Sequence, residues 1–382
     1  MGSSLARDAE STASAKRLGL SVRGERALNV VGTIVLCVFA VGWGVSISTT
    51  HRLPSPASAG GDVTSATAEI TSSLTHEQAP TTAFLTDAAL NAIANRILAG
   101  ARGASGKLKA AIEPSATALR PDVLPNGASL AYANAGHVES RPTAAGIWSV
   151  LLNIGNAMRP ISTFNVIAML PFSAKKNGRV GLYYIGTWPS ERGAVGPAKA
   201  PPSAYATPSG FIEVTQANAA TAVSEHFTLR DFLTHDQPNV WPKYIVLQQK
   251  LVDKLELVLT DLSEHGYDTH GVKVMSGFRT PQYNHGGGNT AGRANLSRHM
   301  YGDAADIYID NDGDGQMDDL DHDGKISIGD ARVIEAAVDR VESAHPELVG
   351  GAGVYTAAPG HGPFIHIDVR GYRARWMGTS GG

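Results

Sequence analysis

An uncharged stretch near the start of the chain constrains its fold more than any other feature. Residues 27–50 contain no Asp, Glu, Lys or Arg, and the apolar run 28–47 approaches the roughly 20 residues that a helix needs to cross a bilayer. Four Lys and Arg residues lie within 16–26, whereas only Arg52 follows closely. Because cytoplasmic flanks carry the excess of Lys and Arg, the pattern predicts a single-pass anchor in the inner (cytoplasmic) membrane. Its tail, 1–26, would be cytoplasmic, and the remaining chain would be periplasmic or otherwise extracytoplasmic.

A cleaved signal peptide is the alternative to this anchor. Its apolar core would be shorter, about 7–15 residues, with a small-residue cleavage site close behind, but the nearest such site, Ala-Ser-Ala at 57–59, is remote. A lipoprotein site is not expected, because Leu36 precedes Cys37 where a small residue is needed. As the only cysteine, Cys37 also excludes an intrachain disulfide. Any metal must therefore be held by His and carboxylate side chains.

Composition limits what the exported part can be. The chain has 382 residues, of which 43% are hydrophobic, so we expect two or three domains, each with its own hydrophobic core. The 42 Gly and 20 Pro indicate a loop-rich chain with linkers. A formal net charge of −3 provides no basic field for nucleic acid, and no nucleic-acid partner is predicted.

The exported part divides by texture into several segments. Residues 51–82, rich in Ser, Thr, Ala, Pro and Gly, predict a flexible linker. Apolar residues at helical intervals predict a short helical segment within 83–118, which could pack on the next domain or on a partner. Runs rich in β-branched and aromatic residues at 127–222 predict a β-rich domain of unknown role. A helix is expected over 244–266, inside a last domain at 225–378.

Two segments of the last domain have the pattern of a metal site. In SRHMYGDAADIYID, His299 and Asp306 stand seven residues apart, with Gly302 between them to let the backbone turn. In PFIHIDVRG, the alternation of a strand places His366 and Asp368 on one face. Two imidazoles and one carboxylate leave a fourth position for water, which is typical of catalytic rather than structural zinc sites.

These segments, together with SGFRTPQYN and GGAGVY, closely resemble the zinc D-alanyl-D-alanine carboxypeptidases and endopeptidases that cut peptidoglycan cross-links, a group that shares its fold with lysostaphin-type and hedgehog domains. The resemblance covers about 225–378. It implies an α+β domain with a small antiparallel sheet and flanking helices, preceded here by the β-rich region and the transmembrane helix. It also implies that His299, Asp306 and His366 are zinc ligands. Arg279 matches the arginine that meets the substrate peptide, a role that suits its planar fork of donors.

The general base departs from the family pattern. Many members place a Glu three residues before the last histidine, or a His two before it, but this chain has Pro363 and Phe364 there. Asp368 and His361 are the alternatives, and Asp368 could instead orient a ligand from the second shell.

An Asp-rich tract at 310–330 interrupts this domain, and only Lys325 opposes its charge. Two overlapping loops fit the D-x-D-x-D-G calcium pattern. The first uses Asp310, Asp312, Asp314 and Asp321, and the second uses Asp319, Asp321, Asp323, Ser327 and Asp330. Because Asp321 occurs in both, its loss should matter most. A solvated acidic loop without calcium is the alternative.

Together these features predict a membrane-anchored zinc metallopeptidase that hydrolyses D-amino-acid-containing bonds in peptidoglycan stem peptides or cross-links, with Zn²⁺ and Ca²⁺ as cofactors and peptidoglycan as partner. The alternative is a calcium-dependent wall-binding or adhesion module with a degenerate peptidase site.

Overall fold

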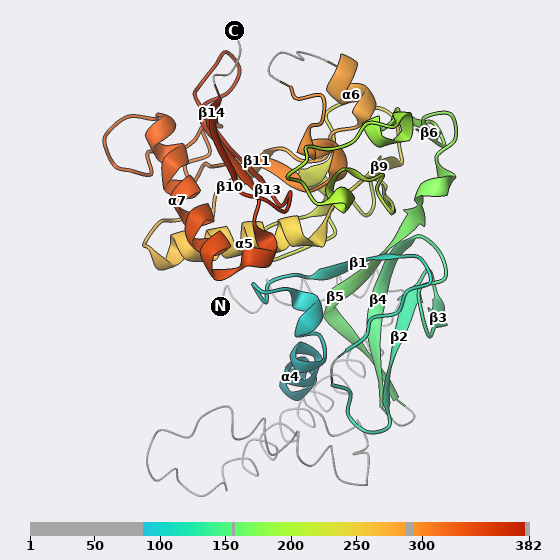
Figure 1. Ribbon diagram of the computed structural model, residues 1–382. Coiled ribbons are helices and arrows are strands. Elements are labelled where there is room, and N and C mark those ends of the chain that lie inside the picture. Colours follow the sequence, from blue (N-terminus) through green and yellow to red (C-terminus); the bar gives the residue numbers. More distant parts are fainter. Residues whose placement is uncertain (1–86, 122, 155–156, 288–292, 379–382) are drawn as a thin grey trace, which may run out of the picture. The chain divides into compact units, whose positions relative to one another are not determined.

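The computed structural model describes four stretches of the chain, at 87–121, 123–154, 157–287 and 293–378. The predicted tail, anchor and linker (1–26, 27–50 and 51–82) lie outside these stretches. Within them, no helix is both long and apolar enough to cross a bilayer. The described chain combines a few helices with mainly antiparallel sheets, in agreement with the α+β prediction at this coarse level (Figure 1).

The first sheet has seven strands in the order β3-β2-β4-β5-β8-β9, with β1 beside β5. These strands are β1 (Ala110–Pro114), β2 (Ala128–Asn134), β3 (His137–Glu139), β4 (Gly146–Ile154), β5 (Ala157–Pro171), β8 (Gly210–Val214) and β9 (Lys243–Ile245). The 15-residue strand β5 pairs with β4 on one edge, and on the other edge first with β1, in parallel, and then with β8.

Alternating side chains give this sheet a core of its own. Along β4, Trp148, Val150, Leu152 and Ile154 are buried while their neighbours are more exposed, which is the period of two expected of a strand with one face in a core. They pack with apolar residues of helix α4 (Asp87–Ile97), including Ile93 and Ile97.

Two segments differ from their predicted structure. The helical segment expected within 83–118 is helical in α4 and in the short 3-10 helix η2 (Gly100–Arg102), but its end forms strand β1. The predicted helix at 244–266 begins later, as α5 (Gln249–Glu264), because Tyr244 and Ile245 are already buried in β9. Apolar spacing alone could not separate these two strand residues from the helix that follows.

The second sheet has five strands in the order β10-β11-β13-β12-β14. These are β10 (Val272–Ser276), β11 (Ala304–Ile309), β12 (Gly351–Tyr355), β13 (Phe364–Asp368) and β14 (Ala374–Gly378). All neighbouring pairs are antiparallel except β12 and β14. Helices α5 and α7 (Ile328–Ala344) cover one face of this sheet (Figure 1). Ile307, Ile365 and Ile367 are buried in the same apolar cluster as residues of these two helices.

Shorter elements complete the described chain, and one apolar cluster packs the two sheets together. These elements are the hairpin β6 (Arg179–Val180) and β7 (Tyr183–Tyr184), helix α6 (Pro281–Gly286), and the 3-10 helices η3 (Phe172–Ala174), η4 (Pro189–Arg192), η5 (Pro202–Tyr205), η6 (Leu229–Phe232), η7 (Arg298–Tyr301) and η8 (Pro346–Leu348). One continuous apolar cluster joins Tyr183, Trp188 and Phe211 to α5, α7 and the second sheet. The predicted boundary between 127–222 and 225–378 runs through this cluster.

Candidate metal centre

The candidate site lies on the face of the second sheet opposite α5 and α7. Strand register places Asp306 of β11 directly beside His366 of β13. His366 in turn pairs with Gly353 of β12, and Gly353 pairs with Trp376 of β14. Residues paired across adjacent strands share a face. The side chains of Asp306, His366 and Trp376 therefore lie on one face of the sheet, and the residues that alternate with them lie on the other.

Three donor atoms converge on this face. Nδ1 of His366 lies 2.8 Å from Oδ1 of Asp306, and Nε2 of His299 lies 3.2 Å from the same oxygen. The two ring nitrogens are 3.1 Å apart. All three side chains are buried, and their ligand atoms lie close enough together to hold one metal ion.

The hydrogen bonds behind the two imidazoles fix which nitrogens face the cluster as bare acceptors. Nδ1 of His299 donates to the carbonyl of Gly277 over 2.7 Å, and Nε2 of His366 donates to Oδ2 of Asp368 over 3.1 Å. In the neutral rings the opposite nitrogens then carry lone pairs. Two lone pairs and a carboxylate oxygen in contact repel each other unless a cation lies between them, so the donor set fits a metal ion.

The pKa values of these three side chains reflect their burial and their contacts with one another. Burial lowers the pKa of His299. Burial also opposes the charged form of His366, but hydrogen bonds with Asp306 and Asp368 outweigh it and raise its pKa to about 9. Burial alone would raise the pKa of Asp306, yet the two imidazoles hold it well below its ordinary value.

The turn that carries His299 is held from several sides. Gly302 ends η7 in the left-handed region at φ 66°, and a Cβ there would lie 2.3 Å from the carbonyl oxygen of Val246. Arg298 forms a buried ion pair with Asp303 and donates to the carbonyl of Ala204 over 2.7 Å.

Aromatic contacts complete that support. The guanidinium of Arg298 lies over the rings of Tyr205 and Tyr301, 4.4 and 4.7 Å from their centroids. The indole of Trp188 donates to the carbonyl of Met300 over 2.8 Å. Residues from the predicted β-rich region therefore help to place a residue of the candidate metal centre.

A cleft of about 1220 Å³ opens onto the cluster. His299, Asp306 and His366 line it together with Arg279. The Arg279 guanidinium donates to Oγ of Ser276 over 3.1 Å and lies 3.9 Å from Asp306. The structure thus places Arg279 beside His299, Asp306 and His366, where its guanidinium can contact a molecule bound in the cleft.

The two candidates for the general base occupy different places. Asp368 is fully buried behind His366, and its carboxylate accepts hydrogen bonds from Gly351 and Arg370 as well. Burial would raise its pKa, but His366 and Arg370 hold it well below the ordinary value. His361, in contrast, lines the cleft. Its Nδ1 donates to the carbonyl of Gly362 over 2.7 Å, which leaves Nε2 as the acceptor.

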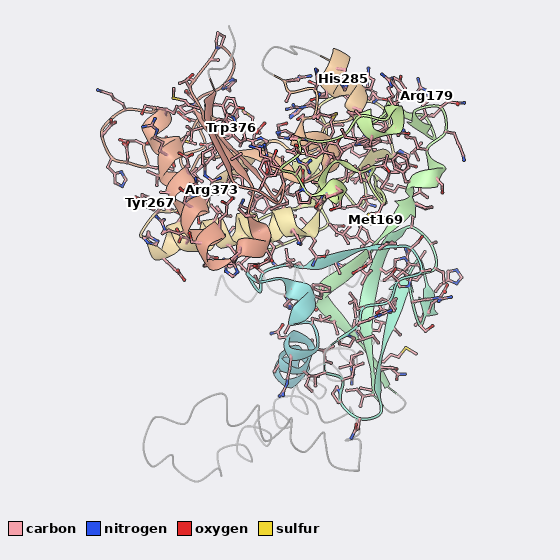
Figure 2. All side chains as sticks on the ribbon, viewed as in Figure 1. Met169, Arg179, Tyr267, His285, Arg373 and Trp376 are labelled. Atoms are coloured by element: carbon pink, nitrogen blue, oxygen red, sulfur yellow. The ribbon has the colours of Figure 1, made fainter. Side chains whose placement is uncertain are left out.

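Among the cleft side chains that sequence reasoning missed are Tyr355, Arg370 and Trp376. The Arg370 guanidinium lies 5.0 Å from the Trp376 ring centroid, and the ring centroids of Trp376 and His366 are 5.3 Å apart. Figure 2 labels Trp376, which belongs to β14. Alternation offered a signal for one of them, because Arg370 continues the face of His366 and Asp368 beyond the end of β13. Predicting that Tyr355 and Trp376 meet in the cleft would have required knowing that β12 pairs with β14.

The Asp-rich tract forms two further carboxylate groups directly after β11. One contains Asp310, Asp312 and Asp318, and the other contains Asp319, Asp321 and Asp330. Asp318 was not predicted, and it takes the place that the sequence assigned to Asp321 in the first loop. Asp321 therefore belongs to the second group alone. Of the remaining predicted ligands, Asp314 and Asp323 are not among the carboxylates of either group, and the Ser327 N–H donates to Oδ2 of Asp330 over 2.7 Å.

The two loops repeat one backbone arrangement. Gly315 N–H donates to Oδ2 of Asp310 over 3.2 Å, and nine residues later Gly324 N–H donates to Oδ2 of Asp319 over 2.8 Å. Both glycines have positive φ, 86° and 82°, which a turn at this position of the loop requires.

The His and Asp groups of this chain could thus hold metal ions at up to three places within the described residues. Comparisons with models of protein families, with curated proteins and with solved structures find no match to this chain.

Proposed function

We propose that the chain is a zinc-dependent peptidase that hydrolyses D-amino-acid-containing peptide bonds in peptidoglycan. The convergence of His299, Asp306 and His366 at the base of a cleft is the observation that supports this proposal. Two imidazoles and one carboxylate suit zinc and leave room for a reacting group. The substrate class rests on the resemblance of the sequence strings, and the proposed site of action is the periplasmic side of the inner membrane.

Zinc at these three donors would supply Lewis-acid chemistry, polarising the scissile carbonyl and making water a nucleophile near neutral pH. Around it, Asp368 holds the His366 ring through Nε2. Arg279, which lines the cleft 3.9 Å from Asp306, would hold a carbonyl or carboxylate of the peptide.

His361 is the side chain of this site best suited to accept a proton. It lines the cleft, its tautomer leaves Nε2 bare, and the edge-on ring of Phe364, 5.1 Å between centroids, supports its ring. Asp368 is poorly placed to act as the general base, because its buried oxygens already accept hydrogen bonds from Gly351 and Arg370.

The proposal is tested with the purified full-length protein in detergent and with isolated sacculi. We expect about one zinc per chain that resists dialysis and soluble muropeptides that mass spectrometry can identify. His299→Ala should bind no zinc and release no muropeptides. His285→Ala removes an imidazole on α6 outside the cleft, and it should bind zinc and release muropeptides like the parent protein. Products from the parent protein that persist without bound metal would disprove the proposal. A protein that binds sacculi without cutting them would support a wall-binding module instead.

We also propose that calcium binds the two carboxylate groups of the Asp-rich tract. Each group places three carboxylates together, and only Lys325 lies within the tract to balance them. Hard oxygen ligands of this kind suit Ca²⁺. Since Asp310 follows directly after β11, which carries Asp306, calcium would also fix the end of a strand of the zinc site.

A further inference from the structure

Tyr355 lies at the end of β12, on the same sheet face as the metal cluster. It pairs with Phe364 of β13 and lines the cleft with Asp306 and Arg279. The charges of these two residues both influence its pKa, so its hydroxyl lies within electrostatic reach of the site. The rings of Tyr355 and Phe364 stack with centroids 4.6 Å apart and an angle of 3° between them.

The hydrogen bonding of Tyr355 leaves its proton available. The indole N–H of Trp376 donates to the Tyr355 oxygen over 3.0 Å. Indole is a donor only, so it occupies a lone pair of the phenol and cannot accept the phenolic proton. Among the residues that the structure describes, the contact with Trp376 is the one hydrogen bond of this hydroxyl, so its proton has no acceptor there.

The backbone around this pair is shaped to hold it. A Cβ on Gly353 would lie 2.2 Å from the Trp376 indole, and one on Gly378 would lie 2.1 Å from the Tyr355 ring. Glycine at these two positions lets both rings lie flat against the strands beside them. The rings therefore occupy space that any other residue would fill.

We propose that Tyr355 is a catalytic residue whose hydroxyl donates a hydrogen bond to the oxygen of the scissile carbonyl as that oxygen gains negative charge. Trp376 is the positioning residue that turns the hydroxyl toward the cleft. Tyr355 keeps its proton throughout, so no bond to it forms or breaks. Burial raises its pKa, in keeping with a neutral donor. This inference rests on the proposed peptidase function.

The chemistry explains why such a donor would matter. A donor fixed before the reaction stabilises charge that develops in the transition state more than it stabilises the neutral carbonyl of the substrate. Arg279 lies close to Asp306, which offsets part of its charge. A neutral phenol adds a second donor without bringing another cation beside the metal.

The test compares Tyr355→Phe with the parent protein and with Tyr267→Phe, which removes a hydroxyl outside the cleft. Three quantities are measured: zinc content, the rate of muropeptide release from sacculi, and affinity by calorimetry. The affinity probes are a phosphinate peptide, built on the bond that the parent protein cuts, and the peptide product of that cut. The phosphinate imitates the charged oxygen, and the product does not.

Tyr355→Phe should keep its zinc and bind the product within about twofold of the parent. Its rate and its affinity for the phosphinate should both fall by about 10²–10³-fold, the usual effect of losing one such donor. Trp376→Phe, which keeps a ring but loses the N–H, should weaken phosphinate binding less than Tyr355→Phe and leave product binding unchanged. Tyr267→Phe should match the parent throughout.

Unchanged affinity of Tyr355→Phe for the phosphinate would overturn the inference, as would loss of zinc or of product binding, because either would mean a structural role. If the parent protein cuts sacculi in those cases, the proposed peptidase function still holds although the role of Tyr355 does not. A parent protein that does not cut sacculi removes both proposals.

Discussion

The Nε2 atom of His366 lies 3.1 Å from Oδ2 of Asp368, on the side of the ring opposite the Nδ1 atom that faces Asp306. Asp368 is held in turn by Arg370 and by the backbone N–H of Gly351. The carboxylate therefore acts on the cluster through the ring of His366, fixing its tautomer and raising the basicity of Nδ1.

Replacing Asp368 by Asn tests this relationship. Asn keeps the shape and an acceptor oxygen but loses the charge, so zinc affinity should fall about 10–100-fold. Competition with a chromophoric chelator measures that affinity. Asp261→Asn removes a carboxylate that pairs with Arg340 on the surface, and it should leave zinc affinity unchanged. An affinity of Asp368→Asn within twofold of the parent would show that the ring needs no such support.

Arg279→Lys tests the predicted contact with substrate. Lysine keeps the charge but loses the planar fork of donors. We expect zinc content to persist, because Arg279 lies 3.9 Å from Asp306 and is not itself a metal ligand. The rate of muropeptide release should fall by about 10²-fold, the lower end of the effect of one lost donor. Arg340→Lys is the matched control at the surface, and equal rates for the two variants would make Arg279 a structural residue.

The alternation of strands explains which parts of the site could be predicted. His366 and Asp368 share a face because successive side chains of a strand alternate, and this follows from the sequence alone. Their meeting with His299 and Asp306 depends on the pairing of β11 with β13, which spacing does not determine. The resemblance of the motif strings supplied that information instead.

Other features depended on contacts between distant segments. Tyr205 packs on Arg298 although 93 positions separate them in the chain, and no local pattern points to that contact. Tyr355 and Trp376 meet because β12 and β14 pair in parallel. Asp318 joins Asp310 and Asp312 through the curvature of the loop, whereas the motif favoured Asp314.

Acid should destabilise the fold through Glu256. Burial alone would raise the pKa of this carboxylate, but hydrogen bonds from the backbone N–H and the ring of His226 outweigh it and lower the pKa from 4.5. The unfolded chain then binds the proton more readily than the folded one. The stabilisation is present above about pH 4.5 and is lost as the pH falls through the lower pKa of the folded state.

Glu256→Gln should therefore lower the free energy of unfolding at pH 7 by about 1.5–3 kcal/mol, since bonds to a charged acceptor are lost. The difference from the parent should narrow as the solution is acidified to pH 3, which urea denaturation at each pH can measure. Glu264→Gln, at the exposed end of α5, should follow the parent at every pH. A constant difference across the range would assign the effect of Glu256 to packing.

Calcium should raise the melting temperature if the two carboxylate groups bind it. A ligand specific for the folded state stabilises by RT ln(1 + [L]/Kd), which is about 2.7 kcal/mol at a hundredfold excess over Kd. Selective chelation of calcium, with zinc held constant in the buffer, should reverse the shift. It should also slow muropeptide release without removing zinc, because the tract continues from the strand that carries Asp306.

Asp318→Asn and Asp314→Asn separate the structural grouping from the sequence motif. Asp318 lies with Asp310 and Asp312, whereas Asp314 accepts a hydrogen bond from the backbone of Gln316 and lies outside the group. Both variants remove one negative charge from the same loop, so a general electrostatic effect would be equal in the two. We expect Asp318→Asn to reduce the calcium-dependent rise in melting temperature and Asp314→Asn to reduce it less. Equal responses would mean that calcium only screens the charge of the tract, and no response in the parent protein would mean that calcium does not bind there.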